Sequence, residues 1–286
     1  MNLFLRKKLI LGTAQLLNKY GLVKNKKSSE KQIYKFLDYI ISDGVRKIDT
    51  APAYNSEIYL GNFIDRNNIK NLKISTKIPS LRKYQYNKKI EFIKRSLNKS
   101  LDRIKHKIDT VYFHDPEDKL FLYKNCEKVC KIFNDFNIKN LGISIYDYKD
   151  IKIINKIENP ISLQFPLNIF NNSFLKIKFK KSNKYFARSI FLQGLLLNKK
   201  INKKIPKQTK NIQKLYFDFL ENKKITAIDY NLSFVLKNKD INGLIIGFDN
   251  IMQYKQLNDY KSINFFDMPK KILKLVKKKD FDPRYW

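Results

Sequence analysis

The sequence predicts an α/β fold, a single (β/α)8 TIM-type barrel, because eight short apolar runs alternate with longer amphipathic segments along its 286 residues. The runs that we expect to be strands are residues 8–14, 45–50, 72–77, 109–114, 139–144, 161–166, 185–191 and 243–247. Polar residues stand at or near the C-terminal ends of five runs, and these are Asp49, Lys77, His114, Ser144 and Gln164. In such a barrel these ends share one face, where active sites are built.

The segments between the runs are typical of amphipathic helices, such as residues 29–44 and 87–104. In the first segment, one apolar face is formed by Ile33, Leu37, Ile40 and Ile41. Ser29 is expected to cap the start of this helix, and Gly44 to stop its end. An open doubly wound sheet is the alternative fold for such an alternation.

No linker or repeat divides the chain, so we expect one domain over residues 1–286. The longest irregular piece is residues 195–210, after the seventh run, and an extra helix near residues 269–279 lies outside the eight units. Cys126 and Cys130 stand four residues apart on an expected helix, which favours helix packing in a reducing compartment over a disulfide framework. The start of the chain resembles no secretory signal and no apolar stretch is long enough to span a membrane, so we predict a cytoplasmic protein.

The formal net charge of +33 has two interpretations. It could attract nucleic acid or an anionic surface. The chain is also rich in Asn and Ile, which like Lys have A/T-rich codons, and the lysines are spread over most of its length. No aromatic RNA-binding strand or zinc-finger spacing accompanies them, so we favour compositional bias and predict no specific nucleic-acid partner.

The sequence lacks the motifs that are typical of several other activities. No two of the eight glycines are separated by a single residue, which excludes a GxGxxG fingerprint, and no GxxxxGK[ST] phosphate loop is present. Two histidines without HExxH or a cysteine cluster argue against a metal site, and the hydrolase motif GxSxG is absent.

Asp49, Tyr54, Lys77 and His114 suit the reduction of a carbonyl. That reaction needs a hydride, which a nicotinamide cofactor supplies, and a proton donor near the carbonyl oxygen. Tyr54 is the candidate donor, because an ammonium such as Lys77 makes a nearby tyrosine a better acid. Asp49 can hold Lys77 in place, and His114 can orient the carbonyl oxygen.

The motifs that carry these residues are IDTAPAYNSE (48–57), STK (75–77) and YFHD (112–115). Together they resemble the aldo-keto reductase superfamily, and further pieces extend the resemblance over nearly the whole chain, from LILGTAQ through LGIS, LQFPLN and RSIFLQGLL to LIIGFDN. GTAQ, IDTAPAY, FHDPEDK and RSIFLQGLLL look most like bacterial members associated with surface-polysaccharide biosynthesis.

The resemblance implies an enzyme that reduces an aldehyde or ketone with NADPH or NADH, in which Asp49, Tyr54, Lys77 and His114 are catalytic. The cofactor-binding residues that it implies are Gly12, Thr13, Asp49, Ser144, Gln164, Arg188, Gly247, Phe248, Asn250 and Gln253.

Three positions depart from the family pattern. Ile145 stands where many members have an asparagine that binds the nicotinamide carboxamide. Arg188 or its neighbour stands where many place a stacking tyrosine, and Asp249 falls where members that use NADPH bind its 2′-phosphate. We therefore also consider the hypothesis that the enzyme uses NADH, or both NADH and NADPH.

The expected partner is a small-molecule carbonyl compound, including sugar-derived carbonyls, and we expect a monomer or weak dimer. The lysines that follow the seventh run suggest an anionic substrate or a contact with the cofactor phosphates, and they are Lys199, Lys200, Lys203, Lys204, Lys207 and Lys210. A solvated loop is the alternative. Two other functions stay open: a non-catalytic regulatory barrel that binds the cofactor, and a sugar dehydratase or epimerase that uses the same tyrosine.

Overall fold

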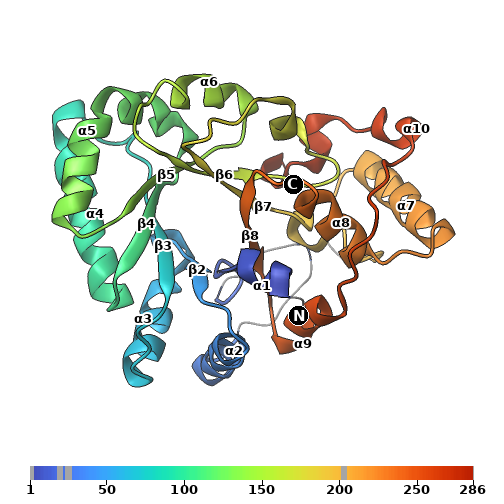
Figure 1. Ribbon diagram of the computed structural model, residues 1–286, viewed down its shortest axis with the longest axis horizontal. Helices are drawn as coiled ribbons and strands as arrows, with labels where there is room; N and C mark the ends of the chain where they lie inside the picture. The colour runs from blue at the N-terminus through green and yellow to red at the C-terminus, as the bar shows by residue number, and fades with distance from the viewer. Residues whose placement is uncertain (1–2, 18–21, 23–27, 201–204, 286) are drawn as a thin grey trace.

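The computed structural model describes residues 3–17, 22, 28–200 and 205–285. Eight parallel strands pair in chain order, and the last pairs with the first, so the sheet closes into a barrel (Figure 1). The strands are β1 (Leu9–Gly12), β2 (Lys47–Asp49), β3 (Lys73–Ile78), β4 (Ile108–Phe113), β5 (Asn140–Ser144), β6 (Ser162–Pro166), β7 (Lys184–Arg188) and β8 (Ile241–Gly247). The predicted (β/α)8 barrel is confirmed.

The strand register brings the ends of the strands together. Gly12 pairs with Asp49 on one side and with Gly247 on the other, and Ser144 pairs with Gln164. β7 ends at Arg188, three residues before the expected end, because the next residue takes a left-handed conformation that a strand cannot continue. The polar residues predicted at strand ends therefore lie at one rim of the barrel.

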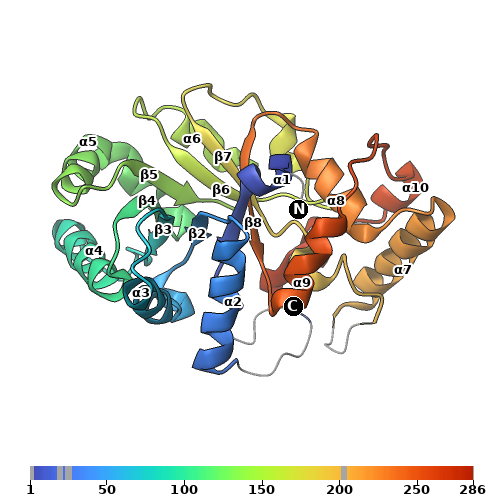
Figure 2. The same ribbon diagram turned by 60° about the horizontal axis from the view of Figure 1, so that its bottom comes forward.

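Helices surround the barrel on its outside (Figures 1 and 2). They are α1 (Leu3–Lys8), α2 (Glu30–Ser42), α3 (Glu57–Arg66), α4 (Lys89–Ile104), α5 (Lys119–Asp135), α6 (Ile151–Ile154), α7 (Lys207–Asn222), α8 (Ala227–Leu236), α9 (Ile251–Lys255) and α10 (Lys270–Leu273). In both views α3, α4 and α5 lie on one side, and α7, α8 and α10 on the other. Within the described ranges, no helix has both the length and the apolar character needed to cross a bilayer.

The ends of α2 follow from its sequence. The Ser29 hydroxyl accepts a hydrogen bond from the Gln32 backbone N–H, while the Gln32 side chain accepts one from the Ser29 backbone N–H. This capping box satisfies N–H groups that the first helical turn leaves unpaired and contributes about 1 kcal/mol. Gly44 follows the helix with φ of +96°, a conformation that glycine adopts without a steric penalty. Both expected signals are confirmed.

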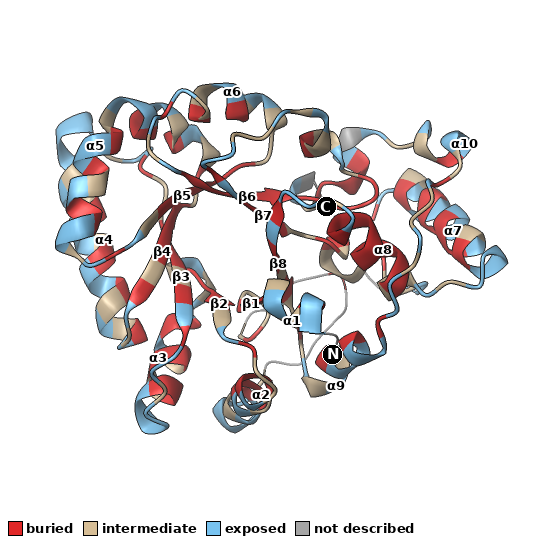
Figure 3. Cartoon of the chain, viewed as in Figure 1, coloured by how far each residue is buried: buried red, intermediate tan, exposed pale blue. Residues whose placement is uncertain are grey.

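The burial of the residues agrees with a barrel of strands surrounded by helices (Figure 3). The strands are largely buried, and the helices are buried on their inner faces and exposed on their outer faces. The predicted apolar face of α2 is buried and includes Ile33, Leu37, Ile40 and Ile41. Cys126 and Cys130 lie on α5 as free thiols with their sulfur atoms 3.9 Å apart, consistent with the expected helix packing.

The expected helix over residues 269–279 is wrong in its extent. α10 is a single turn, and a 3-10 turn follows at Lys278–Phe281. Lys270 and Lys271 each stand three or four residues before Lys274, which stands three before Lys277, and like charges at such spacings destabilise a continuous helix. The chain can therefore turn back toward the barrel rim at its C-terminal end.

Candidate active site

A cavity of about 340 Å³ opens at the rim where the strands end. It is lined by Asp49, Tyr54, Lys77 and His114, which come from three separate strand ends. Asp49 ends β2, Tyr54 lies in the 3-10 turn Pro52–Tyr54 that follows, Lys77 belongs to β3, and His114 directly follows β4. The structure thus brings together the four residues that the sequence singled out.

Asp49 and Lys77 form a buried ion pair. The Lys77 Nζ lies 2.6 Å from Asp49 Oδ2 and donates a second hydrogen bond, of 2.8 Å, to the Thr50 carbonyl. The other Asp49 oxygen accepts hydrogen bonds from Ser75 at 3.1 Å and from Gln164 at 2.6 Å. Burial alone lowers the pKa of Lys77, but the charge and hydrogen bond of Asp49 outweigh it and raise that pKa above its ordinary value. Lys77 is therefore a fixed cation at neutral pH.

Tyr54 lies between this cation and the histidine. Its ring centroid is 5.1 Å from the Lys77 Nζ, and 6.1 Å from the His114 ring centroid in an edge-to-face arrangement. The short turn that carries it begins with Pro52, whose fixed φ suits the first position of a turn, and closes with Asn55 in a left-handed conformation. A hydroxyl donor, an ammonium and an imidazole thus face one cavity.

His114 is neutral at neutral pH. Burial lowers its pKa to about 4, and the positive charges of Lys77 and Arg188 act in the same direction. The backbone N–H of His114 donates to the Ile78 carbonyl at 3.0 Å, which holds the residue against β3. A neutral imidazole keeps one ring N–H as a hydrogen-bond donor.

We expect the free energy of unfolding to fall as the pH drops from about 6.5 to about 4, in part because of His114. In that window the unfolded chain binds a proton at His114 that the native protein does not bind, whereas above it neither state is protonated there. Urea unfolding across this pH range should show a shallower pH dependence for His114→Gln than for the unmodified protein. His106→Gln is the control, because His106 lies outside the cavity. An unchanged pH dependence in His114→Gln would contradict the expectation.

Most of the predicted cofactor-binding residues line the same cavity: Gly12, Asp49, Ser144, Gln164, Arg188, Gly247, Phe248 and Gln253. The two exceptions have other roles. The Thr13 hydroxyl is fully buried, donates to the Asp49 carbonyl at 3.1 Å and accepts from Ser56 at 2.9 Å. The Asn250 side chain caps α9 by accepting from the Gln253 N–H at 2.9 Å. Neither side chain contributes to the cavity lining.

Gln164 carries an unused acceptor. Its Nε2 donates to Asp49, while its Oε1 is buried and has no hydrogen-bond partner among the described residues. Such an orphaned buried acceptor costs free energy unless a bound donor satisfies it, and a carboxamide N–H of a nicotinamide fits it. The Ile145 side chain is fully buried and has no polar atom to offer the carboxamide. Arg188 Nη2 donates instead to Ser144 Oγ and to the Ile145 backbone carbonyl, each at 3.3 Å.

Tyr146 is a cavity residue that the sequence did not indicate. Two guanidinium groups contact its ring: the Arg188 Cζ lies 4.2 Å from the ring centroid and the Arg284 Cζ 4.0 Å. Arg284 also pairs with Asp282, and its Nε lies 2.9 Å from one carboxylate oxygen and 3.0 Å from the other. No local signal marks Arg284, because it reaches this rim only through the return of the C-terminal segment.

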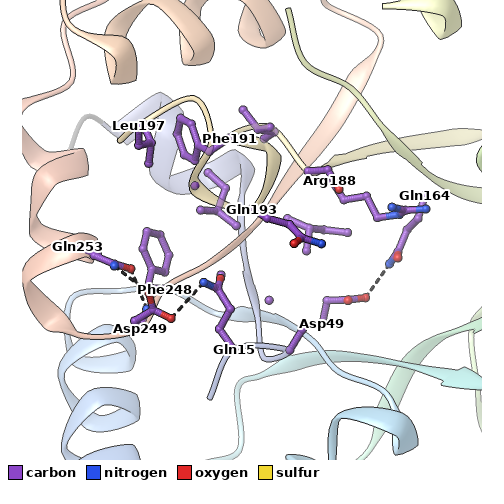
Figure 4. A pocket seen from close by; sticks show the side chains of 18 of the residues that line it. Gln15, Asp49, Gln164, Arg188, Phe191, Gln193, Leu197, Phe248, Asp249 and Gln253 are labelled. Carbon is purple, nitrogen blue, oxygen red and sulfur yellow. Dashed lines mark hydrogen bonds between the residues drawn. The ribbon is translucent and has the colours of Figure 1, made fainter. Parts of the chain in front are cut away.

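A second polar group lies across the cavity from Arg188 and Gln164 (Figure 4). The Asp249 carboxylate accepts hydrogen bonds from Gln15 Nε2 at 3.1 Å and from Gln253 Nε2 at 2.8 Å, while the Asp249 N–H donates to Gln253 Oε1 at 2.8 Å. Gln15 can lie here because residue 247 is glycine: a Cβ on Gly247 would approach Gln15 Oε1 to 2.1 Å. The motif GTAQ contained Gln15, but its role was not predicted.

The loop after β7 also faces the cavity, with Phe191 and Leu197 among its lining residues (Figure 4). Ser189, Gln193 and Gly194 line the cavity as well and have left-handed backbones, with φ of 57°, 55° and 89°. Backbone N–H groups in such conformations can form concave anion-binding sites. RSIFLQGLL was part of the resemblance, but only its arginine had been assigned to the site.

The lysines after β7 do not support the expected role at the active site. Lys199, Lys200 and Lys210 border a separate depression beside Phe217 and Asp218, and none of the described lysines of this segment lines the catalytic cavity. Lys207 begins α7. The two remaining lysines of the set, Lys203 and Lys204, lie outside the described residues.

A family model described as the aldo/keto reductase family matches residues 8–278. The chain belongs to the aldo/keto reductase family. The family predicted from the motifs is therefore confirmed, and the protein is an NAD(P)H-dependent carbonyl oxidoreductase that uses NADPH or NADH. None of the curated protein sequences matches the chain.

Several solved structures have a similar fold, in agreement with this family membership. A glycerol dehydrogenase from Gluconobacter oxydans is 17% identical, with a TM-score of 0.67 over 97% of this chain and 91% of that one. A Pseudomonas aeruginosa protein assigned as an aldo-keto reductase is also 17% identical, with a TM-score of 0.65 over 87% of each chain. A protein assigned as a 2,5-diketo-D-gluconic acid reductase B is 15% identical, with a TM-score of 0.61 over 94% of this chain and 86% of that one.

Proposed function

We propose that this reductase converts an aldehyde or ketone to an alcohol with Tyr54 as the general acid. The observation that carries the proposal is the buried Asp49–Lys77 ion pair beside Tyr54 and His114 in one cavity. An ion pair without further function is a weak source of stability at such depth, because both charges lose their hydration. Its position beside the ring of a cavity tyrosine, Tyr54, would give the pair a chemical role.

In the proposed reaction the Tyr54 hydroxyl donates a proton to the carbonyl oxygen of the substrate. Lys77 stabilises the tyrosinate that remains, and Asp49 keeps the ammonium charged and in place. The neutral His114 imidazole donates a hydrogen bond to the same oxygen and orients it. When bound, the reduced nicotinamide supplies the hydride for the carbonyl carbon.

Three parts of the cavity suit a nicotinamide cofactor. Gln164 Oε1 would accept a hydrogen bond from the carboxamide, with Ser144 beside it. The left-handed backbone at Ser189 and Gln193 in the β7 loop would bind the pyrophosphate through its N–H groups, whereas the Gly194 N–H already donates to the Phe191 carbonyl. The residues after β8, with Asp249 among them, would face the adenosine end.

The Asp249 group supports a preference for NADH. Two glutamine side chains hold this carboxylate at the cavity wall, so it cannot readily rotate away. A carboxylate repels the 2′-phosphate of NADPH, whereas it can accept hydrogen bonds from the free ribose hydroxyls of NADH.

We expect kcat/KM to be at least about tenfold higher with NADH than with NADPH. The reason is the repulsion between the Asp249 carboxylate and the 2′-phosphate of NADPH. Asp249→Asn should reduce the ratio of kcat/KM for NADH to kcat/KM for NADPH, mainly by lowering KM for NADPH. Asp259→Asn removes a nearby exposed carboxylate outside the cavity and is the matched control. A strong NADPH preference in the unmodified protein would refute the assignment.

The function itself is tested by a screen of aldehydes, ketones and sugar-derived carbonyl compounds with both cofactors, following the absorbance of the reduced nicotinamide. Turnover of at least one carbonyl compound that depends on Tyr54 is the expected result. Tight cofactor binding without any turnover would instead favour a regulatory barrel. A changed sugar without net cofactor consumption would favour a dehydratase or epimerase.

A further inference from the structure

Arg188 is a cation inside the cavity whose hydrogen-bond and ring partners are neutral, while the charge of Asp282 acts on it from beyond ion-pair distance. Its guanidinium contacts the Ser144 hydroxyl, the Ile145 carbonyl and the Tyr146 ring. Within the described ranges of the chain, no carboxylate lies within ion-pair distance of it. Its charge reaches the catalytic centre, where it contributes to the lowered pKa of His114.

Arg284 adds a second guanidinium behind this wall, where it contacts Tyr146, a lining residue, without lining the cavity itself. It contacts the Tyr146 ring, as Arg188 does, so one tyrosine brings the two cations close together. Asp282 pairs with Arg284 and is the one carboxylate of this group among the described residues, which leaves one positive charge in excess among them. The Asp49–Lys77 pair is neutral overall and does not offset that charge.

We propose that the substrate carries an anionic oxygen group, a carboxylate or a phosphate ester, which Arg188 and Arg284 bind while its carbonyl faces Tyr54 and His114. This inference rests on the proposed reductase function. Guanidinium groups match carboxylates and phosphates through paired hydrogen bonds. The tyrosine between them can hold both guanidinium planes ready for the anion, which lowers the entropy cost of binding.

The position of Arg188 favours a substrate contact over a cofactor contact. A cation against the nicotinamide would disfavour its oxidised, positively charged form, whereas an anionic substrate would be stabilised. The carboxylate of Asp249 lies on the opposite side of the cavity (Figure 4). The cavity thus has a positive wall near the catalytic residues and a negative group at its far end.

The test compares two matched substrate pairs with the unmodified enzyme. 4-Oxobutanoate is compared with 4-oxobutanamide, and glyceraldehyde 3-phosphate with glyceraldehyde. We expect kcat/KM to be at least about tenfold higher for the anionic member of one pair or both, the usual contribution of a charge-assisted hydrogen bond. Which pair shows the difference identifies the carboxylate or the phosphate. The advantage should shrink as ionic strength rises.

Two variants assign the effect to these residues. Arg284→Gln should raise KM for the anionic substrate about tenfold or more, with little change for its neutral partner. Arg188→Gln should raise KM for the anionic substrate about tenfold more than it raises KM for the neutral one. Arg66→Gln is the matched control, because Arg66 also pairs with a carboxylate, Glu30, and contacts a tyrosine ring, that of Tyr34, on the outside of the barrel. The Kd of NADH is measured for every variant by fluorescence.

The outcomes separate the two proposals. Turnover of the neutral aldehydes with no advantage for their anionic partners would overturn the anion site and leave the reductase function in place. Weaker NADH binding in Arg188→Gln, with no selective change for the anionic substrate, would overturn it as well, since Arg188 would then bind the cofactor. No turnover of any of the four compounds or of the wider screen would refute the reductase function, and the anion site with it.

Discussion

Replacing Tyr54 with phenylalanine should lower kcat by a factor of about one hundred or more while leaving the Kd of NADH unchanged. The ring stays and only the hydroxyl is lost, so the cavity keeps its shape and the general acid disappears. General acid catalysis usually contributes about 10²–10⁴ in rate. Steady-state turnover of an aldehyde found in the substrate screen, together with fluorescence titration of NADH, checks both parts.

Tyr123→Phe is the control for this experiment, because Tyr123 is an exposed tyrosine on α5, away from the cavity. It should retain full kcat. Near-full kcat in Tyr54→Phe would remove the tyrosine from the mechanism. Loss of NADH binding in the same variant would show that the substitution acts on the cofactor site instead.

Lys77→Met should both abolish most turnover and destabilise the fold. Asp49 would keep a buried charge without its ammonium partner, and breaking such a pair costs about 3–5 kcal/mol. The tyrosinate would also lose the cation that stabilises it, so we expect kcat to fall at least about a hundredfold. Urea unfolding and steady-state kinetics on the same preparation measure the two effects.

The double variant Asp49→Asn with Lys77→Met separates stability from catalysis. Removing both charges leaves no unpaired buried ion, so much of the lost stability should return. Activity should not return, because no ammonium faces Tyr54. Recovery of turnover in the double variant would contradict the role given to Lys77. Stability as low as in the single variant would show that the buried charge was not the cause of the loss.

The barrel could be predicted because its signals are local. The eight apolar runs, the Ser29 cap and the Gly44 stop each depend on a few neighbouring residues, and the structure retains all of them. The C-terminal helix was overextended because helical periodicity competed with lysine repulsion along a short segment. The early end of β7 depends on the left-handed conformation of Ser189, for which the sequence has no glycine to indicate it.

The meeting of the four proposed catalytic residues in one cavity could be predicted for the same reason. Asp49, Lys77 and His114 follow or end strands, and a parallel barrel places all such ends at one rim. Thr13 and Asn250 also follow strands, but their side chains turn to backbone partners and leave the cavity. Proximity to a strand end therefore predicts the rim, while the direction of a side chain depends on its neighbours in space.

The sequence by itself determined the barrel, the family and the four residues that meet in the rim cavity, because each rests on short motifs and their order along the chain. Only the tertiary structure decided that Gln15 and Gln253 hold Asp249 at the cavity wall, and that Arg188 and Arg284 meet at one tyrosine. The two arginines are almost a hundred residues apart, and their shared contact exists only because the C-terminal segment folds back over the rim. Such residues meet only when the chain has folded, so no local sequence pattern predicts their contact.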